Sequence, residues 1–343
     1  MISSRRPRLT PAIADLRRAV RELLPEDGLV LVGLSGGADS LALAAAAAFE
    51  APRAGLTVGA VIVDHGLQAG SVDVARVAAD QARLLGLDPV LIETVLVADD
   101  DGAGPEAAAR SARYAAFESA LARTGAVGVL LGHTLDDQAE TVLLGLARGS
   151  GATSLQGMAP VSGAYRRPLL GIRRTQTRQA CLDAGLEAWS DPQNLDPRYA
   201  RVRARLRVLP VLERELGPGI AEALARTAET LREDADALDA LVRGMLGEMA
   251  QPRPDGVALP VETLAAQPAA LRQRIIRLAV AREFGVWLER SHTLAVARLV
   301  THWHGQNTLD LPGVRVERQG GMLVFSVPRP TQTKGPFRTH GTS

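Results

Sequence analysis

Apolar residues in the first 150 positions form short runs that do not alternate with polar residues, and helical patterns separate these runs. Such runs are typical of strands covered on both faces, and helices between them imply parallel crossovers. The expected strands span residues 28–34, 56–64, 89–97 and 127–131. The expected helices span residues 38–49, 71–85 with Ser71 as N-cap, 104–123 and 135–147, after a leading helix within residues 1–26. The pattern predicts an α/β fold with a doubly wound parallel sheet.

The pattern changes after Pro210. Helical periodicity covers residues 213–249 and 268–281, and alternating residues within 308–327 predict two or three small strands. We therefore expect an N-terminal nucleotide-binding domain over residues 1–217 and a smaller, mainly helical C-terminal domain over residues 218–328. Residues 329–343 are rich in proline, glycine and threonine and are predicted to be a disordered tail.

Charge and composition exclude several classes of protein. The formal net charge is +1, so any nucleic-acid partner must be held by a local basic patch. The only lysine is Lys334 and the only cysteine is Cys181, which excludes a P-loop lysine within the domains, a disulfide framework and a cysteine-based zinc site. No apolar stretch is long enough to span a bilayer, and the basic N-terminus lacks the apolar core of a secretory signal. These features predict a cytoplasmic protein without a membrane partner.

A turn rich in serine and glycine, between the first expected strand and helix, is the strongest functional motif. It consists of Ser35, Gly36, Gly37, Ala38, Asp39 and Ser40. Glycines let the backbone approach an anion closely, and free amides at a helix start point at it. Asp39 would repel a phosphate unless it holds a metal ion, so we expect Mg²⁺ to bridge Asp39 and pyrophosphate. The alternative is a purely structural strand–helix turn, and neither a Walker A loop nor a Rossmann fingerprint is present.

This turn resembles the PP-loop of N-type ATP pyrophosphatases. Relatives that transfer sulfur need reactive cysteines or a cluster, and amidotransferase-type relatives need a glutaminase, neither of which this chain provides. Four further segments narrow the choice: Val63-Asp64-His65-Gly66-Leu67, residues 104–114, residues 132–141, and residues 191–194 followed by 199–205. Together with the turn, in this order and at this spacing, they resemble the tRNA(Ile)-lysidine synthase family in its short form, most strongly over about residues 25–215.

The resemblance implies ATP as the cofactor, and a tRNA(Ile) with a CAU anticodon and L-lysine as substrates. The C2 carbonyl oxygen of the wobble cytidine attacks the α-phosphate of ATP and pyrophosphate leaves. The ε-amine of lysine then attacks C2 and displaces AMP. The product, lysidine, pairs with A instead of G, so the codon specificity changes from AUG to AUA. A homodimer is a further expectation.

The second half of this reaction needs a neutral amine. A lysine side chain has a pKa of about 10.4, so deprotonating it near neutrality costs about 4–5 kcal/mol, which a nearby carboxylate or desolvation must offset. Residues 133, 136, 137 and 140 would share one face of a helix and supply an imidazole and three carboxylates. The alternative is a solvated, acid-rich helix N-terminus.

The candidate site residues form three groups. Those expected in catalysis are Asp39, Arg113, His133, Asp137 and Glu140, with Asp39 as the metal ligand. Those expected to bind the nucleotide are Ser35, Gly36, Gly37, Ala38, Asp39, Ser40, Asp64, His65 and Gly132. Those expected to bind lysine are Glu106, Arg110, Arg113, Asp136, Asp137 and Glu140. A structural role for His65 and an exposed Glu106–Arg110 ion pair are the alternatives at those positions.

An arginine-rich segment predicts the contact with tRNA. Residues 166–207 contain ten arginines against four acidic residues, a local excess that can bind phosphates. The residues expected to contact RNA are Asn194, Arg201, Arg203, Arg205 and Arg207. Since the four arginines are two apart, a single helix cannot present them all on one face, and some are expected to hold ATP or acids instead. Val202 and Ala204 stand where the family pattern has Asn and Ile, which weakens any role assigned by analogy at position 202.

Two other functions stay open at this point. Another PP-loop adenylating enzyme with a small-molecule acceptor would share the turn, but it would not need the arginine segment or the second domain. A nucleotide-binding regulatory module would keep the glycines without needing Asp39, Asp137 and Glu140 together.

Overall fold

The computed structural model describes residues 9–66, 70–95, 105–149, 151–305 and 308–328, with the side chains of Pro105 and Glu106 outside the description. The chain forms two compact units, Met1–Arg232 and Glu233–Ser343, whose division falls within helix α10 (Ile220–Met249). Each unit is described separately. The predicted tail over residues 329–343 lies outside the described residues.

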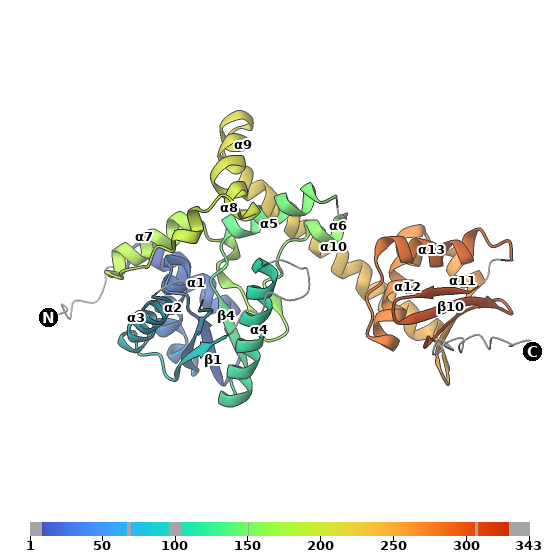
Figure 1. The fold of residues 1–343 in the computed structure, drawn as a ribbon, viewed down its shortest axis with the longest axis horizontal. Coiled ribbons are helices and arrows are strands. Elements are labelled where there is room, and N and C mark those ends of the chain that lie inside the picture. The colour runs from blue at the N-terminus through green and yellow to red at the C-terminus, as the bar shows by residue number, and fades with distance from the viewer. Residues whose placement is uncertain (1–8, 67–69, 96–104, 150, 306–307, 329–343) are drawn as a thin grey trace, which may run out of the picture. The chain divides into compact units, whose positions relative to one another are not determined.

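The N-terminal unit is built on a six-stranded sheet with the order β3-β2-β1-β4-β6-β5 (Figure 1). Strands β1 (Leu29–Gly33), β2 (Thr57–Asp64), β3 (Val90–Thr94) and β4 (Gly128–Leu131) run parallel, with Leu31 opposite Gly59 on one side and Val129 on the other. β6 (Tyr165–Arg166) continues the parallel sheet, and β5 (Val161–Ser162) closes it antiparallel. The predicted doubly wound parallel sheet is confirmed, whereas the two-residue strands β5 and β6 left no apolar run to detect.

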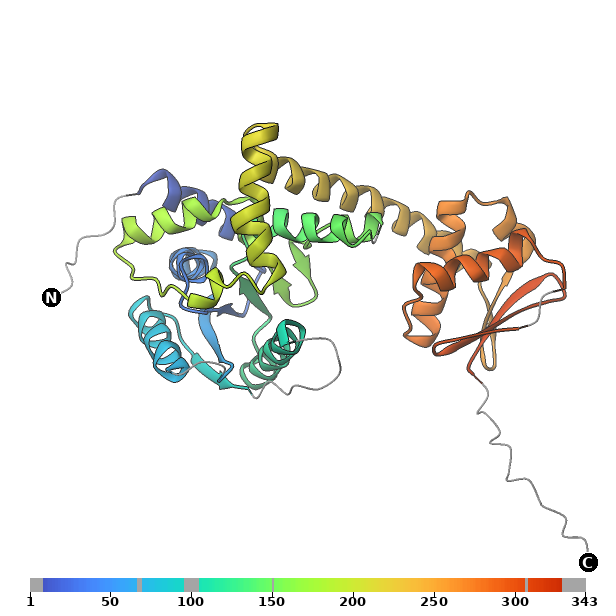
Figure 2. The ribbon, with the colours of Figure 1, turned by 45° about the horizontal axis from the view of Figure 1, so that its top comes forward.

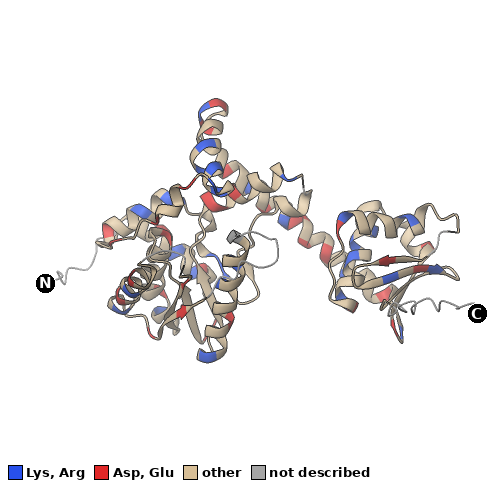
Figure 3. Ribbon diagram, viewed as in Figure 1, with Lys and Arg blue, Asp and Glu red and all other residues tan. Residues whose placement is uncertain are grey.

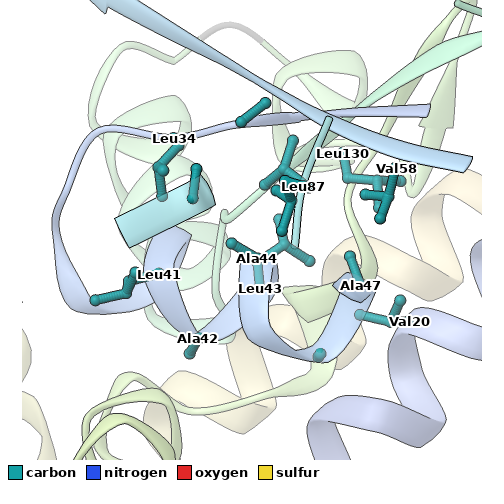
Figure 4. Close-up of a cluster of buried hydrophobic side chains, with 14 of the residues drawn as sticks. Val20, Leu34, Leu41, Ala42, Leu43, Ala44, Ala47, Val58, Leu87 and Leu130 are labelled. Atoms are coloured by element: carbon teal, nitrogen blue, oxygen red, sulfur yellow. The ribbon is translucent and has the colours of Figure 1, made fainter. Parts of the chain in front are cut away.

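Helices cover both faces of this sheet (Figure 2). On one face lie α1 (Pro11–Leu23), α2 (Ala38–Glu50), α3 (Ser71–Leu84) and α7 (Arg174–Ala184), which share one apolar core with the strands. α2 is apolar around most of its circumference, as expected for a buried helix, and its Leu41 and Leu43 belong to the same core as Val58 and Leu130 (Figure 4). On the other face, α4 (Pro105–Thr124) contributes Phe117 and Ala120 to a smaller core.

The remaining elements of this unit follow the fourth parallel strand. They are α5 (Leu135–Ala147), α6 (Ala152–Leu155), η2 (Pro168–Gly171), η3 (Pro192–Leu195), α8 (Ala200–Arg203), the π-helical turn η4 (Ala204–Val208) and α9 (Leu209–Leu216), with η1 (Pro52–Ala54) earlier in the chain. Two helices begin differently from the prediction. The leading helix begins at Pro11, and Gly70 instead of Ser71 is the N-cap of α3.

The structure groups the first part of α10 with the N-terminal unit, whereas the sequence suggested a boundary between residues 217 and 218. Ala221 packs with Leu135 and Leu209 in one small apolar cluster, and Arg232 donates to the carbonyl of Met158 at 2.8 Å. These contacts, made by side chains far apart in sequence, tie the start of α10 to α5 and α9. The glycines at 217 and 219 only interrupt the chain locally.

The C-terminal unit combines helices with a five-stranded antiparallel sheet in the order β7-β8-β11-β10-β9. The strands are β7 (Gln251–Arg253), β8 (Gly256–Pro260), β9 (Leu309–Leu311), β10 (Val314–Gln319) and β11 (Met322–Ser326), and the helices are α11 (Val261–Ala266), α12 (Ala269–Phe284) and α13 (Arg290–Thr301). The expectation of a mainly helical domain therefore missed β7 and β8. Both are short and contain proline or glycine, and β8 becomes a central strand only by pairing with β11.

Within the described ranges of the chain, no helix combines the length and apolarity needed to cross a bilayer. Figure 3 shows why: acidic and basic positions recur along the helices of both units.

The centre of the parallel sheet leaves no space for a side chain at Gly59. A methyl group there would lie 2.5 Å from the carbonyl oxygen of Pro89 and 2.9 Å from a methyl of Leu31. Gly59→Ala is expected to lower the free energy of unfolding by about 1–3 kcal/mol, because strands on both sides resist displacement. Gly171→Ala is the matched control, since nothing lies within 4 Å of its added carbon, and it should change stability by less than about 0.5 kcal/mol in urea denaturation. Equal stability of the two variants would contradict this packing.

Candidate active site

A cavity opens at the carboxyl ends of β1, β2 and β4, where open parallel sheets bind their ligands. Its volume is about 1410 Å³, and residues of the N-terminal unit line it. Pockets for single drug-sized ligands usually measure about 300–1,000 Å³, so this cavity has space for a nucleotide and a second reactant.

The structure brings most of the predicted site residues to this cavity. Those that line it are Ser35, Gly37, Ala38, Asp39, Ser40, Asp64, His65, Arg110, Arg113, Gly132, His133, Asp137, Asn194, Arg201 and Arg205. Those that do not line it are Gly36, Asp136, Glu140, Arg203 and Arg207. The side chain of Glu106 lies outside the described residues.

The glycine turn (residues 35–40) is held by its own serines. The Ser40 hydroxyl accepts a hydrogen bond from the Ser35 amide at 3.1 Å and donates to the Gly37 carbonyl at 3.0 Å. Gly36 has a φ of +80°, which favours glycine, and Gly37 precedes the first residue of α2. The turn therefore presents the N-terminus of a buried helix to the cavity, an arrangement that suits an anion.

Two other segments close around this turn. At Gly132, which follows β4, an added carbon would lie 3.1 Å from the backbone of Asp39 and Ser40, so a side chain there would require the glycine turn to shift slightly. From the other side, the Trp189 amide donates to the Gly36 carbonyl at 2.9 Å, and Trp189 lines the cavity. Trp189 was not among the predicted site residues, although a tryptophan just before the 191–194 segment was a usable signal in a chain with few aromatic residues.

Arg174 connects three carboxylates beside the cavity. Its guanidinium donates to Asp39 at 3.2 Å, to Asp137 at 2.6 Å and to Glu140 at 3.3 Å. Its backbone amide also donates to Asp136 at 2.7 Å. The sequence indicated this residue only as one member of the arginine-rich segment. It had no local signal, because its carboxylate partners lie 34 to 135 positions away.

Asp137 is buried but ionised. Its Oδ2 accepts from the amide and the hydroxyl of Thr134, both at 2.8 Å, in a capping box at the start of α5. Burial alone would raise its pKa, but the charge of Arg174 and the Thr134 hydrogen bonds outweigh burial and hold the pKa below its usual value.

Glu140 differs from the expectation of a direct lysine ligand. Its side chain is 0 % exposed and lies behind Arg205, which donates to its two oxygens at 2.7 and 3.0 Å. Arg205, which was expected to contact RNA, is 22 % exposed, lines the cavity and is bonded to Glu140. A fully buried carboxylate must be paired, and truncating one partner of such a pair typically costs about 3–5 kcal/mol.

Asp39 carries the features expected of a cation ligand. Its Oδ1 accepts from the Thr177 hydroxyl and its Oδ2 from Arg174, and burial raises its pKa despite these partners. A divalent cation would compensate this unfavourable charge. Among the described residues no group of three or more His, Cys, Asp or Glu side chains could hold a metal by itself. Mg²⁺ usually binds through one or two carboxylates together with phosphates, so a single Asp39 beside the glycine turn fits it.

Arginines and neutral histidines also line the cavity. Burial and the nearby charges of Arg167, Arg201 and Arg110, partly offset by Asp137, lower the pKa of His133 to about 4. Burial and the charge of Arg113 likewise lower the pKa of His65. The Nδ1 atoms of both imidazoles are buried without a hydrogen-bond partner among the described residues. The cavity therefore favours an anionic ligand near Arg110, Arg113 and Arg201.

The arginines of the 201–207 segment divide between two environments, as their spacing suggested. Arg201 donates to Thr141 at 3.1 Å and lies 3.8 Å from Glu140, while Arg203 and Arg207 are exposed. Arg203 donates to the carbonyls of Pro197 and Arg198. The π-helical turn η4 lies within this segment, and Arg201 and Arg205, four positions apart, both contact Glu140. Val202 is buried, so an apolar residue suits its position.

Asp64 and Asp136 mainly organise backbone. Asp64 Oδ1 accepts from the Gly66 amide at 3.0 Å and shapes the turn that presents His65. Asp136 holds the first residue of α7 and approaches Arg173 at 3.6 Å. A direct contact of Asp136 with lysine is therefore not what this geometry favours.

Each of the two units contains a match to a known protein family. The PP-loop domain family matches residues 11–212, and the family described as the TilS substrate binding domain matches residues 259–324. A tRNA(Ile)-lysidine synthase of Leifsonia xyli subsp. xyli is 65% identical over 303 residues, covering 88% of this chain and 91% of the relative. One from Thermobifida fusca is 52% identical over 323 residues, covering 92% and 98%.

Among solved structures, the U34-tRNA thiolase NcsA from Methanococcus maripaludis with its [4Fe-4S] cluster has a similar fold. The TM-score is 0.55 at 19% identity, with 65% of this chain and 80% of the thiolase covered. At this level of identity the likeness concerns the fold alone.

The environment of His133 predicts a pH-dependent stability. The folded protein binds the proton with a pKa of about 4 and the unfolded chain with the ordinary 6.5, so falling pH between these values favours unfolding. From pH 7 to pH 5 this group alone should remove about 2 kcal/mol from the free energy of unfolding. His133→Gln, a neutral replacement, should lack this component in urea denaturation at the two pH values. The same pH dependence in both proteins would contradict the assignment.

Proposed function

Because the chain belongs to the tRNA(Ile)-lysidine synthase family, we propose that it makes lysidine at the wobble position of a tRNA(Ile) with a CAU anticodon, using ATP and L-lysine. The observation that carries this proposal is the single cavity that joins the glycine turn to Asp137 on one side and Arg113 on the other. The one cavity thus contains groups that can bind a triphosphate, an ammonium group and a carboxylate.

The first half of the reaction uses the glycine turn. The start of α2 and the hydroxyls of Ser35 and Ser40 bind the phosphates, and the cytidine oxygen attacks the α-phosphate. Asp39 would hold Mg²⁺, which supplies charge neutralisation at the phosphates. Arg110, Arg113 and Arg201 line the same cavity and add further positive charge, which favours the departure of pyrophosphate.

The second half uses the carboxylates beside the cavity. Asp137 lines the cavity and its Oδ2 is taken by Thr134, so Oδ1 binds an ammonium group of lysine, and Glu140 acts through Arg205 and Arg174. Arg113 can bind the α-carboxylate bidentately. His133 stays neutral near pH 7 because of its lowered pKa, so it adds no positive charge that would repel the amine.

The tRNA has two sets of contacts in this proposal. Asn194, which lines the cavity, and the exposed Arg203 and Arg207 bind phosphates or bases of the anticodon region. The C-terminal unit, which matches the substrate binding family, binds another part of the tRNA. We also propose a cytoplasmic location, where tRNA, ATP and lysine meet, and a homodimer, which light scattering after gel filtration would test.

The function is tested by supplying the protein with ATP, Mg²⁺, radiolabelled lysine and a CAU-anticodon tRNA(Ile). Lysine should be incorporated and pyrophosphate released only with this tRNA. Asp39→Asn should lower pyrophosphate release by at least about 100-fold, since the phosphates lose their metal ligand. Asp73→Asn is the control, an exposed residue of α3 paired with Arg76. Vigorous exchange of pyrophosphate into ATP without RNA would favour a small-molecule acceptor instead.

A second test concerns the RNA surface. Arg207→Gln removes one exposed charge, so tRNA binding should weaken. The slope of log K against log salt, which is negative, should become smaller in magnitude by about 1. Filter binding at several salt concentrations measures both quantities. Arg83→Gln, an exposed arginine of α3 that pairs with Asp80, should leave the slope unchanged. Identical slopes in the two variants would remove Arg207 from the interface.

A further inference from the structure

Arg174 contacts the carboxylates that both reactants, the nucleotide and lysine, would use. In the protein without ligands, its guanidinium contacts Asp39 on the nucleotide side and Asp137 on the lysine side, at 3.2 and 2.6 Å. We infer that Arg174 is a positioning residue that makes the binding of lysine depend on the binding of nucleotide. This inference rests on the proposed function and assigns a role to a residue outside the motifs that identify the family.

The lysine side shows why Arg174 must move. Both hydrogen bonds from Thr134 go to Oδ2 of Asp137, so an incoming ammonium must use Oδ1. Arg174 holds this oxygen at 2.6 Å, and the side chain of Asp137 is only 11 % exposed. This oxygen cannot bind the ammonium group of lysine while the guanidinium of Arg174 contacts it.

Nucleotide binding would displace Arg174 from Asp39. Both oxygens of Asp39 are in use, Oδ1 by Thr177 and Oδ2 by Arg174. A cation arriving with the nucleotide competes with the guanidinium for Oδ2. The phosphates at the adjacent glycine turn are at the same time strong acceptors for a guanidinium. Nucleotide binding therefore draws Arg174 away from the carboxylates and leaves Asp137 accessible.

The exchange involves Arg174 and not its neighbour Arg205. Arg205 binds the fully buried Glu140 through two hydrogen bonds at 2.7 and 3.0 Å and makes only a longer contact of 3.4 Å with Oδ1 of Asp137, so it remains in place and holds this oxygen far less closely than Arg174 does. Arg174 instead makes one bond to each of three acids. Its backbone is fixed by Asp136 at 2.7 Å, so the side chain can turn while the start of α7 stays where it is.

Calorimetric titration of the full-length protein with L-lysine tests the inference. The titration is done alone and with Mg²⁺ and α,β-methylene ATP, which cannot be cleaved between its α- and β-phosphates. The wild type should bind lysine at least about 10-fold more tightly with this nucleotide, and lysine should tighten nucleotide binding by the same factor. In Arg174→Gln, the lysine affinity should change by less than about 3-fold on adding nucleotide. Arg174→Lys, which offers one donor group in place of three nitrogens, should also lose most of the dependence.

Arg178→Gln is the matched control. This arginine lies one turn further along α7 and lines the same cavity, but no hydrogen bond or ion pair to Asp39, Asp137 or Glu140 is present in the described structure. It should keep the nucleotide dependence of the wild type. Equal lysine affinity of the wild type with and without nucleotide overturns the inference, whatever the variants do. Full dependence in both Arg174 variants also overturns it, and failure to bind lysine under either condition refutes the proposed function as well.

Discussion

The pairing of three carboxylates, two of them buried and one half-buried, with two arginines is the interaction on which the active site depends. Asp39 comes from the glycine turn, Asp137 and Glu140 come from α5, and Arg174 and Arg205 come from later parts of the chain. Each carboxylate alone would be costly to bury. Together the five groups connect the phosphate-binding turn, α5, α7 and the π-helical turn η4. The cluster is therefore both a structural junction and the acidic side of the cavity.

The cavity is lined by charges of both signs. The charge of Arg174 helps to hold Asp137 ionised, so it can receive an ammonium group. Arg110, Arg113 and Arg201 line the same cavity with two neutral histidines and favour anions. A zwitterionic amino acid and a triphosphate can both be accommodated because groups of both signs are available. The histidines must be neutral for this, since protonation of His133 would add charge near Arg167, Arg201 and Arg110.

The fold is shared with an enzyme of different chemistry, which shows that the site decides the reaction. A thiolase uses sulfur chemistry on a similar scaffold, but the one cysteine of this chain is unsuited to it. Cys181 is buried and donates to the carbonyl of Ala38 at 3.3 Å, and burial together with the charge of Asp39 raises its pKa to about 11. A thiol in this state is a poor nucleophile. The groups that remain for chemistry are carboxylates, arginines and the helix N-terminus.

The sequence by itself determined the parallel sheet, the glycine turn and the family, because these depend on local patterns: continuous apolar runs, helical periodicity and short motifs of fixed order. It also showed that the arginines of 201–207 could not all face one way. Only the tertiary structure decided which of them turn inward, that Glu140 is buried behind Arg205, and that Arg174 joins Asp39 to Asp137. Strands β7 and β8 were likewise missed, since their pairing with β11 is a long-range contact. The same physical reason applies to each case. The neighbouring sequence of an arginine or of a short strand is no different when the residue is buried than when it is exposed, and its partner lies far away in the chain.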